Sequence, residues 1–464
     1  MGSLRARLKL AILALGVLLL GLTPYPQAYT AAMRWAEAHR AAREYGAALD
    51  AYREAARLQP ESPLPWLRRG EVLLAQHRFP QATTAFEEAE QRGGGVEALL
   101  GQGEGYAGSG DLLQAVDVWL RALILAPGDA RPRIALGRAS IDQGLFDQAA
   151  RHLDRALQLE PSREEAVMAH ALLGRLLIDD DPARAADHFR QAGDQDMLSV
   201  LDAAAAEPDA VRRALLLGAA FLQRDELSLA RRHFEQAVAL APTDAEALAY
   251  LAHVLDRIGW TVAAGELLTE ALDRDPDSAL AYFFLGVHDH RLGYLADAQA
   301  ALWEALLRDP DNAALRVEMA ETFVDLHDYP GAEEWYLGAI ETAPGDIEFH
   351  LLLAHFYLDH LYRVEEGGVP AAEAAVALAP SDARAQDLLG WAYHLAGRHA
   401  EGEQALTQAL ALDPGLVSAH YHLGSLYATT GRPELARRHL QRAVDLDTGE
   451  YYRRRAQTIL SDLQ

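Results

Sequence analysis

The sequence contains 18 histidines and no cysteine, so metal ligation by imidazole is the first chemistry to consider. If these stretches are helical, residues two apart point in different directions and residues five apart do not meet, so such spacings form no chelating pair. His355 and Asp359 have the favourable i, i+4 spacing but supply only two ligands. We therefore expect packed or partly exposed histidines and no metal site. The densest groups are His288 with His290, His420 with His422, and His350, His355 and His360.

No nucleophile or cofactor motif accompanies these histidines. The absence of cysteine excludes disulfides and thiolate catalysis, and the lysine Lys9 lies near the N-terminus, away from any phosphate-cradling loop. The glycine-rich run Gly101–Gly105 has no strand pattern before it and falls within a helical pattern instead. We therefore expect the protein not to be an enzyme and to need no small-molecule cofactor.

The charge balance restricts the class of partner. Lys and Arg number 42 against 68 Asp and Glu, which gives a net charge of −26. Such a field repels phosphate backbones, so we expect no nucleic-acid partner and a preference for basic or neutral protein segments.

The N-terminus has a basic head followed by an apolar run. Arg5, Arg7 and Lys9 precede Leu10–Leu22, and Pro24 and Pro26 follow it. This layout predicts an uncleaved signal anchor over residues 1–28, a single membrane-spanning segment with the rest of the chain outside the cytoplasm. Two alternatives stay open. The segment is a cleaved signal and the protein is secreted, or it is a helix that packs on a cytoplasmic protein.

An internal repeat in the sequence predicts the helices that position these residues. Prolines that close short acidic or apolar stretches recur mostly every 34 residues or so. Within one unit, Leu248, Leu251 and Leu255 mark one helical face, and Ala264, Leu268 and Ala271 mark a second after Gly259. Each unit therefore predicts two amphipathic helices. The prolines are Pro60, Pro127, Pro161, Pro242, Pro276, Pro310, Pro344, Pro380 and Pro414.

The pattern resembles the tetratricopeptide repeat family. The unit that opens at Leu416 has Leu423-Gly424, Tyr427, Ala436, Leu440 and Ala443 in the family's order, and the unit that opens at Val96 has Leu99, Gly103, Tyr106, Ala115, Trp119, Ala122 and Pro127. The resemblance implies an all-α fold, a right-handed α-α superhelix of about twelve helix-turn-helix repeats, preceded here by the N-terminal hydrophobic helix.

Departures from the repeat predict the domain organisation. Residues 29–197 form an N-terminal array of about five repeats, the last degenerate, and 198–210 form an insertion with an extra short helix. Residues 211–450 form a C-terminal array of about seven repeats, and residues 451–464 form a capping helix that buries Tyr452, Ile459, Leu460 and Leu463. Gly367 and Gly368 predict a shortened second helix in the unit that follows Gly345.

In this family the first helix of each repeat lines the concave surface, which implies a groove for a partner. Trp391 and Tyr421 offer the large contact area that is common in binding hot spots. Together with the N-terminal segment, the resemblance predicts a non-enzymatic scaffold, tethered to the membrane, that binds a partner's peptide or helix, in assembly of a cell-envelope complex. The alternative is a cytosolic adaptor without membrane insertion. The implied groove residues are His253, Asp256, Phe283, His290, Glu321, His355, Asp387, Trp391, His394 and Tyr421.

Overall fold

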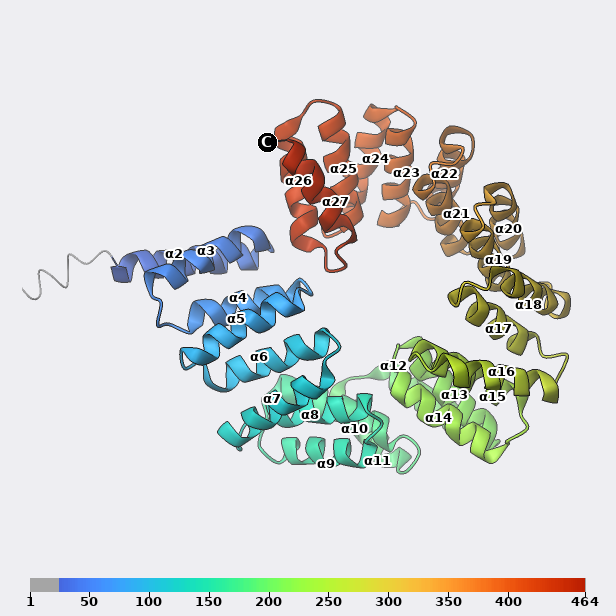
Figure 1. Cartoon of the computed structure of the whole chain (residues 1–464), viewed down its shortest axis with the longest axis horizontal. Coiled ribbons are helices and arrows are strands. Elements are labelled where there is room, and N and C mark those ends of the chain that lie inside the picture. Colours follow the sequence, from blue (N-terminus) through green and yellow to red (C-terminus); the bar gives the residue numbers. More distant parts are fainter. Residues whose placement is uncertain (1–24, 464) are drawn as a thin grey trace, which may run out of the picture. The chain divides into compact units, whose positions relative to one another are not determined.

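The structure is a computed structural model that describes residues 25–463, and in this range it contains helices and no strand (Figure 1). By its contacts the chain divides into two compact units, Met1–Pro127 with Tyr427–Gln464 and Gly128–Leu426. Consecutive helices pair from α2 with α3 to α23 with α24, apart from α12, and α25 and α26 follow in the chain, so the predicted all-α solenoid of about twelve repeats is confirmed.

The first unit combines both ends of the chain. Its helices are α2 (Tyr25–Ala41), α3 (Tyr45–Leu58), α4 (Leu64–Ala75), α5 (Phe79–Gln91), α6 (Gly95–Gly108), α7 (Leu112–Leu125), α26 (Pro433–Leu446) and α27 (Tyr451–Asp462).

The second unit holds the longer run of repeats. Its helices are α8 (Arg131–Asp142), α9 (Phe146–Leu157), α10 (Arg163–Leu177), α11 (Pro182–Ala192), α12 (Gln195–Ala206), α13 (Ala210–Gln223), α14 (Leu227–Leu240), α15 (Ala245–Arg257), α16 (Thr261–Arg274), α17 (Ala279–Arg291), α18 (Leu295–Arg308), α19 (Ala313–Asp325), α20 (Tyr329–Thr342), α21 (Ile347–Asp359), the π-helix η1 (Val364–Gly368), α22 (Val369–Leu378), α23 (Ala383–Leu395), α24 (His399–Leu412) and most of α25 (Val417–Thr429).

Local sequence sets the helix boundaries. The Asp244 carboxylate accepts a hydrogen bond from the Ala247 backbone N–H at 3.0 Å and so caps α15. Asn312 caps α19 in the same way through Ala314 and Leu315. Between α15 and α16, Gly259 has φ of +91°, a left-handed conformation that glycine adopts without a Cβ penalty. Caps and turns of this kind set the ends of many of the described α-helices, which have 10 to 17 residues.

Two irregular elements lie where the repeat pattern breaks. The single helix α12 lies between the α10–α11 pair and the α13–α14 pair, at the predicted insertion. The second helix of the unit after Gly345 is short, as predicted: η1 precedes α22, which has 10 residues. A Cβ on Gly367 would lie 2.4 Å from the Tyr357 ring, so this close approach requires glycine. The division of the repeats into arrays 29–197 and 211–450 remains a prediction, and the two compact units have other boundaries.

Within the first unit, the C-terminal helices contact the N-terminal repeats through buried polar groups. The Gly46 backbone N–H donates to Asp445 Oδ1 at 2.8 Å, and Gln76 Nε2 donates to the Asp445 carbonyl at 3.2 Å. Arg453 Nη2 donates to the Gln76 carbonyl at 3.1 Å. Gln76, Asp445 and Arg453 are all buried. The two ends of the repeat array are therefore hydrogen-bonded to each other.

The capping helix packs differently from its prediction. It lies against α26, as a terminal cap does. Its fully buried residues are Arg453 and Ala456, whereas the predicted apolar set Tyr452, Ile459, Leu460 and Leu463 is only partly buried. The reason is that α27 also contacts Gln76 of the second repeat, which requires a hydrogen-bonding side chain at position 453.

The predicted N-terminal hydrophobic helix lies outside the described residues. Among residues 25–463, none of the helices combines the length and the apolar character that a membrane span needs.

Candidate partner-binding surface

All ten predicted groove residues lie on first helices, but several are engaged by the next repeat. Asp256 is buried, and its Oδ1 lies 3.0 Å from His288 Nδ1 while its Oδ2 lies 2.9 Å from Arg291 Nη1. Its carboxylate therefore joins α15 to α17. His253 stacks on Phe284 with ring centroids 4.4 Å apart, and burial lowers the pKa of His253 to about 4.

The next three predicted residues are also partly engaged. Phe283 is half-buried against the hydrophobic core. His290 Nε2 lies 3.0 Å from Asp325 Oδ2, which joins α17 to α19. Glu321 accepts a hydrogen bond from the Tyr336 hydroxyl, and burial of that phenol, together with this bond, raises the pKa of Tyr336. These side chains therefore contribute to contacts between and within repeats.

The remaining predicted residues come together near the end of the second unit. The Trp391 ring stacks on His422 with centroids 4.3 Å apart and lies 6.3 Å from the Tyr421 ring and 5.2 Å from the His394 ring. His394 Nδ1 lies 3.0 Å from His399 Nδ1. We name Trp391, His394, His399, Tyr421 and His422 the histidine–aromatic cluster. It joins three helices, α23, α24 and α25.

A buried carboxylate fixes the orientation of one imidazole in this cluster. Asp387 Oδ1 lies 2.8 Å from His422 Nδ1, and both side chains are buried. An imidazole held at one nitrogen by a carboxylate keeps a fixed ring orientation, so the ring on which Trp391 stacks is held in place. Trp391 and Tyr421 are partly exposed above it.

His355 on α21 lies beside the cluster and is the most accessible of the predicted residues. Its side chain is 48% exposed, and its Nδ1 is 3.8 Å from Asp359 Oδ2. Desolvation by the surrounding protein lowers the pKa of His355, whereas the negative charges of Asp359 and Asp387 raise it by a smaller amount. At neutral pH it therefore offers a neutral imidazole to solvent.

Sequence reasoning missed the partners that hold the predicted residues in place. His288 and His422 were considered for metal ligation but not as partners of Asp256 and Asp387, and His399, the partner of His394, was not considered. The signal was available, because Asp256 with His288 and Asp387 with His422 are about one repeat apart. Acid and histidine at that spacing lie on neighbouring first helices.

The histidines show no metal-binding arrangement. Within residues 25–463, no group of three His, Asp or Glu side chains could hold a metal ion. His350 Nε2 and His420 Nε2 each lie 3.2 Å from a proline carbonyl, of Pro344 and Pro414, at the start of their repeats.

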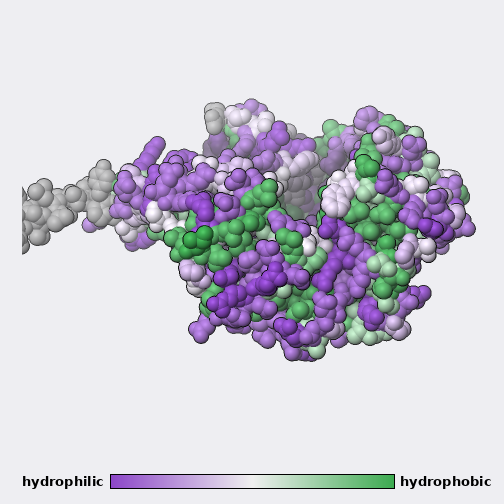
Figure 2. Space-filling view, turned by 60° about the horizontal axis from the view of Figure 1, so that its bottom comes forward, coloured by the Kyte–Doolittle hydropathy of each residue, from purple (hydrophilic) through white to green (hydrophobic). Residues whose placement is uncertain are grey.

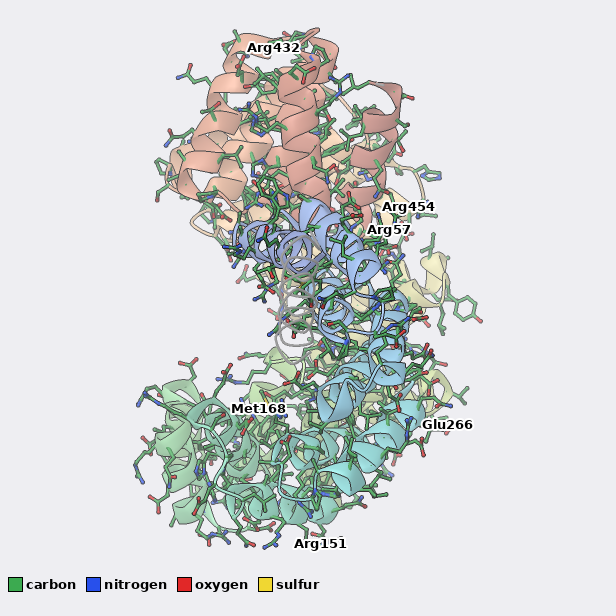
Figure 3. All side chains as sticks on the ribbon, turned by 90° about the vertical axis from the view of Figure 1, so that its left-hand side faces the viewer. Arg57, Arg151, Met168, Glu266, Arg432 and Arg454 are labelled. Atoms are coloured by element: carbon green, nitrogen blue, oxygen red, sulfur yellow. The ribbon has the colours of Figure 1, made fainter. Side chains whose placement is uncertain are left out.

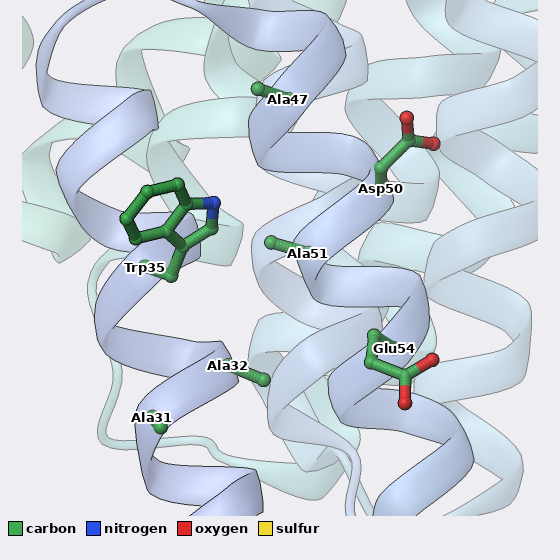
Figure 4. A pocket seen from close by; sticks show the side chains of 7 residues that line it. All are labelled: Ala31, Ala32, Trp35, Ala47, Asp50, Ala51 and Glu54. Atoms are coloured by element: carbon green, nitrogen blue, oxygen red, sulfur yellow. The ribbon is translucent and has the colours of Figure 1, made fainter.

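A second apolar surface lies on the first repeat. Trp35 on α2 is 63% exposed and lines a pocket together with small side chains of α2 and α3 (Figure 4). Four alanines line this surface, and Asp50 and Glu54 are at its edge. Sequence reasoning missed Trp35, although the alternation of one large and several small residues at helical spacing was visible. The alanines are Ala31, Ala32, Ala47 and Ala51.

Apolar residues are also visible elsewhere on the surface. Figure 2 shows them in several separate areas among hydrophilic residues. Scattered areas of this kind are common on soluble proteins, so hydropathy alone does not identify a binding surface.

Comparison with known proteins identifies the family. Two models described as tetratricopeptide repeat match the chain, one at residues 289–356 and 393–458 and the other at 67–130, 134–199 and 366–417. The chain belongs to the tetratricopeptide repeat family. The predicted resemblance is thus confirmed.

Individual relatives match part of the chain or match it distantly. The Protein CTR9 homolog of Arabidopsis thaliana is 32% identical over 124 residues, which are 26% of this chain and 11% of that protein. Yeast Tom70 is similar in structure, with 15% identity, a TM-score of 0.42, and coverage of 86% of this chain and 95% of that one. MamA from Desulfovibrio magneticus is 25% identical, with a TM-score of 0.32, over 37% of this chain and 97% of that one.

Proposed function

We propose that this protein is a non-enzymatic scaffold that binds a segment of a partner protein on the first helices of its C-terminal repeats. The observation that supports this best is the histidine–aromatic cluster with His355 beside it. Two large aromatic rings are partly exposed there, and the buried Asp387–His422 pair fixes the ring beneath them. A rigid platform of this kind binds a flexible segment without losing entropy of its own.

The chemistry of the platform favours an extended peptide or a helix with apolar and neutral or basic side chains. Aromatic rings provide contact area with few rotatable bonds, and imidazoles both donate and accept hydrogen bonds. The net charge of −26 adds long-range attraction for basic segments. The partly exposed residues His253, Phe283, His290 and Glu321 would extend the same surface along the preceding repeats, whereas the buried Asp256 would act only by holding α15 and α17 together.

Site-specific photo-crosslinking in the protein's own cells tests this proposal. A photoreactive phenylalanine analogue at His355, which is half-exposed, should form adducts with a partner protein. The matched control places the analogue at Trp303 on α18, a second helix, where the side chain is 51% exposed. Adducts from both positions in equal yield, or from neither, would contradict the proposal.

A substitution then distinguishes an effect on partner binding from an effect on folding. Trp391→Ala should abolish or strongly reduce the adducts formed at position 355 while the melting temperature stays within a few degrees of wild type. Trp303→Ala removes the same side chain from an outer position and should leave the adducts unchanged.

We further propose that residues 1–28 tether the scaffold to a membrane, with the repeats outside the cytoplasm and in service of a cell-envelope assembly. The support is the basic head with Arg5, Arg7 and Lys9 before Leu10–Leu22. The untagged chain should sediment with membranes after a carbonate wash, and a chain that starts at Tyr29 should not. Recovery of the full-length chain in the wash would instead favour the cytosolic adaptor.

A further inference from the structure

The contact between α3 and α26 in the first unit buries a carboxylate that forms no ion pair among the described residues. Asp445 is 4% exposed, and its Oδ1 accepts hydrogen bonds from the Gly46 N–H at 2.8 Å and from Gln441 Nε2 at 3.2 Å. Both donors are neutral. A buried carboxylate without a cationic partner costs free energy, because it loses its hydration and gains no opposite charge. Asp445 would therefore be more stable in water, or in the contact with a proton bound.

The charged groups nearest to Asp445 do not neutralise it. Glu44, at the start of α3, adds a second negative charge, and its own partner is His39 on α2. Arg442 on α26 is the cation that acts on Asp445, but its Nη1 donates to two backbone carbonyls in the turn between α2 and α3. The carboxylate therefore lies between an anion and a cation that bonds elsewhere.

The other charged groups at this contact also have other partners. Arg453 Nη2 donates to the Gln76 carbonyl at 3.1 Å and to the Asp447 carbonyl. The Asp447 carboxylate accepts the Arg453 backbone N–H at 2.7 Å. Arg78, in the turn after α4, donates to Gln76 Oε1 at 3.3 Å, and the exposed Glu450 is the carboxylate whose charge acts on it. None of these side chains forms an ion pair with the buried carboxylate.

This environment makes the contact depend on protonation. Desolvation raises the pKa of Asp445 above its ordinary value, and the hydrogen bonds from Gly46 and Gln441 lower it by smaller amounts. When the ends separate, water surrounds the carboxyl and its pKa returns to about 3.9. The joined ends therefore bind a proton more tightly than the separated ends do. By linkage, the contact is strongest when this carboxyl is protonated, and it weakens as the pH rises through the raised pKa.

The contact can open while the repeats stay folded. Its hydrogen bonds are each worth about 1 kcal/mol net. The core cluster around Leu67 is made of residues 33–98 and includes no part of α26 or α27. Where α26 approaches α3, a Cβ on Gly46 would lie 3.0 Å from Gln441 Nε2 and 3.2 Å from Asp445 Oδ1, so polar atoms meet there. Separation exposes these polar groups to water and leaves that core intact.

We propose that this contact is a pH-sensitive latch between the two ends of the repeat array, which closes when Asp445 binds a proton and loosens when Asp445 is ionised. The end latch consists of Gly46, Gln76, Asp445 and Arg453. Its opening frees the first and last repeats from each other and leaves each of them folded. The histidine–aromatic cluster lies in the other unit, so the latch is separate from the proposed partner-binding platform.

The backbone N–H of Gly46 reports directly on the latch. Asp445 is its acceptor, and it lies in the first turn of α3, where an N–H has no acceptor within the helix. Hydrogen exchange resolved to single amides measures its protection factor in the full chain, after correction for the intrinsic rate at each pH. The protection factor should rise about threefold from about pH 7.5 to about pH 5. The Ala247 N–H, which donates to Asp244 at the start of α15, is the matched control and should show no such rise.

Two substitutions separate the charge of Asp445 from its hydrogen bond. Asp445→Asn keeps an oxygen for the Gly46 N–H and removes the charge, so the protection factor at about pH 7.5 should exceed that of wild type about threefold or more and should no longer depend on pH. Asp445→Ala removes the acceptor, and protection should be lost at both pH values. Asp462→Asn, which changes an exposed acid on α27, should behave as wild type.

Three outcomes would overturn the proposal. The first is a protection factor of Gly46 that is the same at both pH values in wild type. The second is loss of protection in Asp445→Asn to the level of Asp445→Ala, since the contact would then need the charge. The third is a pH dependence that persists in Asp445→Asn, which would assign the effect to the pair of His39 and Glu44. The wild-type comparison needs no substitution, so it decides the case even where a variant does not fold.

Discussion

At several positions in this protein, neighbouring helices approach so closely that only glycine fits between them. The glycine-rich run in α6 illustrates this, because it resembles a phosphate loop in sequence and serves packing in the structure. A Cβ on Gly101 would lie 2.4 Å from the Phe86 ring, and one on Gly105 would lie 2.3 Å from Thr83 Oγ1. Glycine is required at these points by the bulk of the residue opposite, in spite of its low helix propensity.

Gly103→Ala should therefore destabilise the first unit. The added Cβ would lie 2.1 Å from Trp119 Nε1, and Trp119 is buried and rigid. The gain in helix propensity, about 1 kcal/mol, is smaller than the cost of overpacking, about 1–3 kcal/mol. Urea unfolding should show a net loss in free energy of unfolding. Gly128→Ala, where the Cβ meets no neighbour, is the control, and an equal effect at both positions would contradict the argument.

The histidine pair His394–His399 should make stability depend on pH. Burial, and the proximity of His399 and His422, lower the pKa of His394 from 6.5 to about 4. The unfolded chain therefore binds more protons between these values, so the free energy of unfolding should fall as the pH drops from about 6.5 to about 4. Chemical unfolding at several pH values measures this slope.

His394→Asn should reduce that slope, because asparagine does not titrate. His350→Asn is the control and should keep the wild-type slope. A slope that is the same in wild type and His394→Asn would show that other groups carry the pH dependence.

At the scale of the helix, ion pairs link the inserted helix α12 to the helix pairs before and after it. Arg175 on α10 contacts Asp194 at the start of α12 and Glu226 at the start of α14, and all three side chains are largely buried. The extra helix thus adds ion pairs to the apolar packing of its residues Met197, Leu201 and Ala204 in the core. Arg175 and Glu226 also line, with Met168, a cavity of about 560 Å³ between α8, α10 and the start of α14.

Arg175→Met should destabilise the second unit by about 2 kcal/mol, since it leaves Glu226 and Asp194 without their cation. Arg190→Met is the matched control, because its partner Asp187 is exposed and such surface pairs contribute about 0–1 kcal/mol. Denaturant unfolding of both variants gives the comparison. Equal losses would show that the ion pairs of Arg175 contribute no more to stability than an exposed pair does.

At the scale of the whole molecule, contacts between the two ends distinguish this chain from a solenoid in which each repeat touches only its neighbours. Arg442 Nη1 donates to the Ala42 carbonyl at 3.0 Å and the Arg43 carbonyl at 2.8 Å, in addition to the buried bonds of Asp445 and Arg453. The stability of the first repeats therefore depends on residues some 370 to 400 positions later.

Arg453→Ala should speed amide hydrogen exchange in α4 as well as in α27, because it removes the hydrogen bond to the Gln76 carbonyl. Arg454→Ala, at the exposed neighbouring position labelled in Figure 3, is the control and should leave exchange in α4 unchanged. Faster exchange confined to α26 and α27 would contradict the coupling of the two ends.

The sequence by itself determined the helix pairs, their number, the extra helix near residue 198 and the shortened helix after Gly367. Each of these follows from a pattern within one repeat: apolar spacing, a cap, a glycine or a proline, which act on the local backbone. It also placed Trp391, His394 and Tyr421 on adjacent first helices, since repeat register alone predicts that neighbourhood.

The tertiary structure decided which of those residues are engaged and which remain accessible. Asp256 and Asp387 appear as free acids in the sequence, but histidines of the next repeat bind them. The cavity at Met168 and the contact of Arg453 with Gln76 also appear only in three dimensions. The physical reason is that these contacts depend on how small rotations between repeats add up over the array, and a periodic pattern of apolar residues does not encode those rotations.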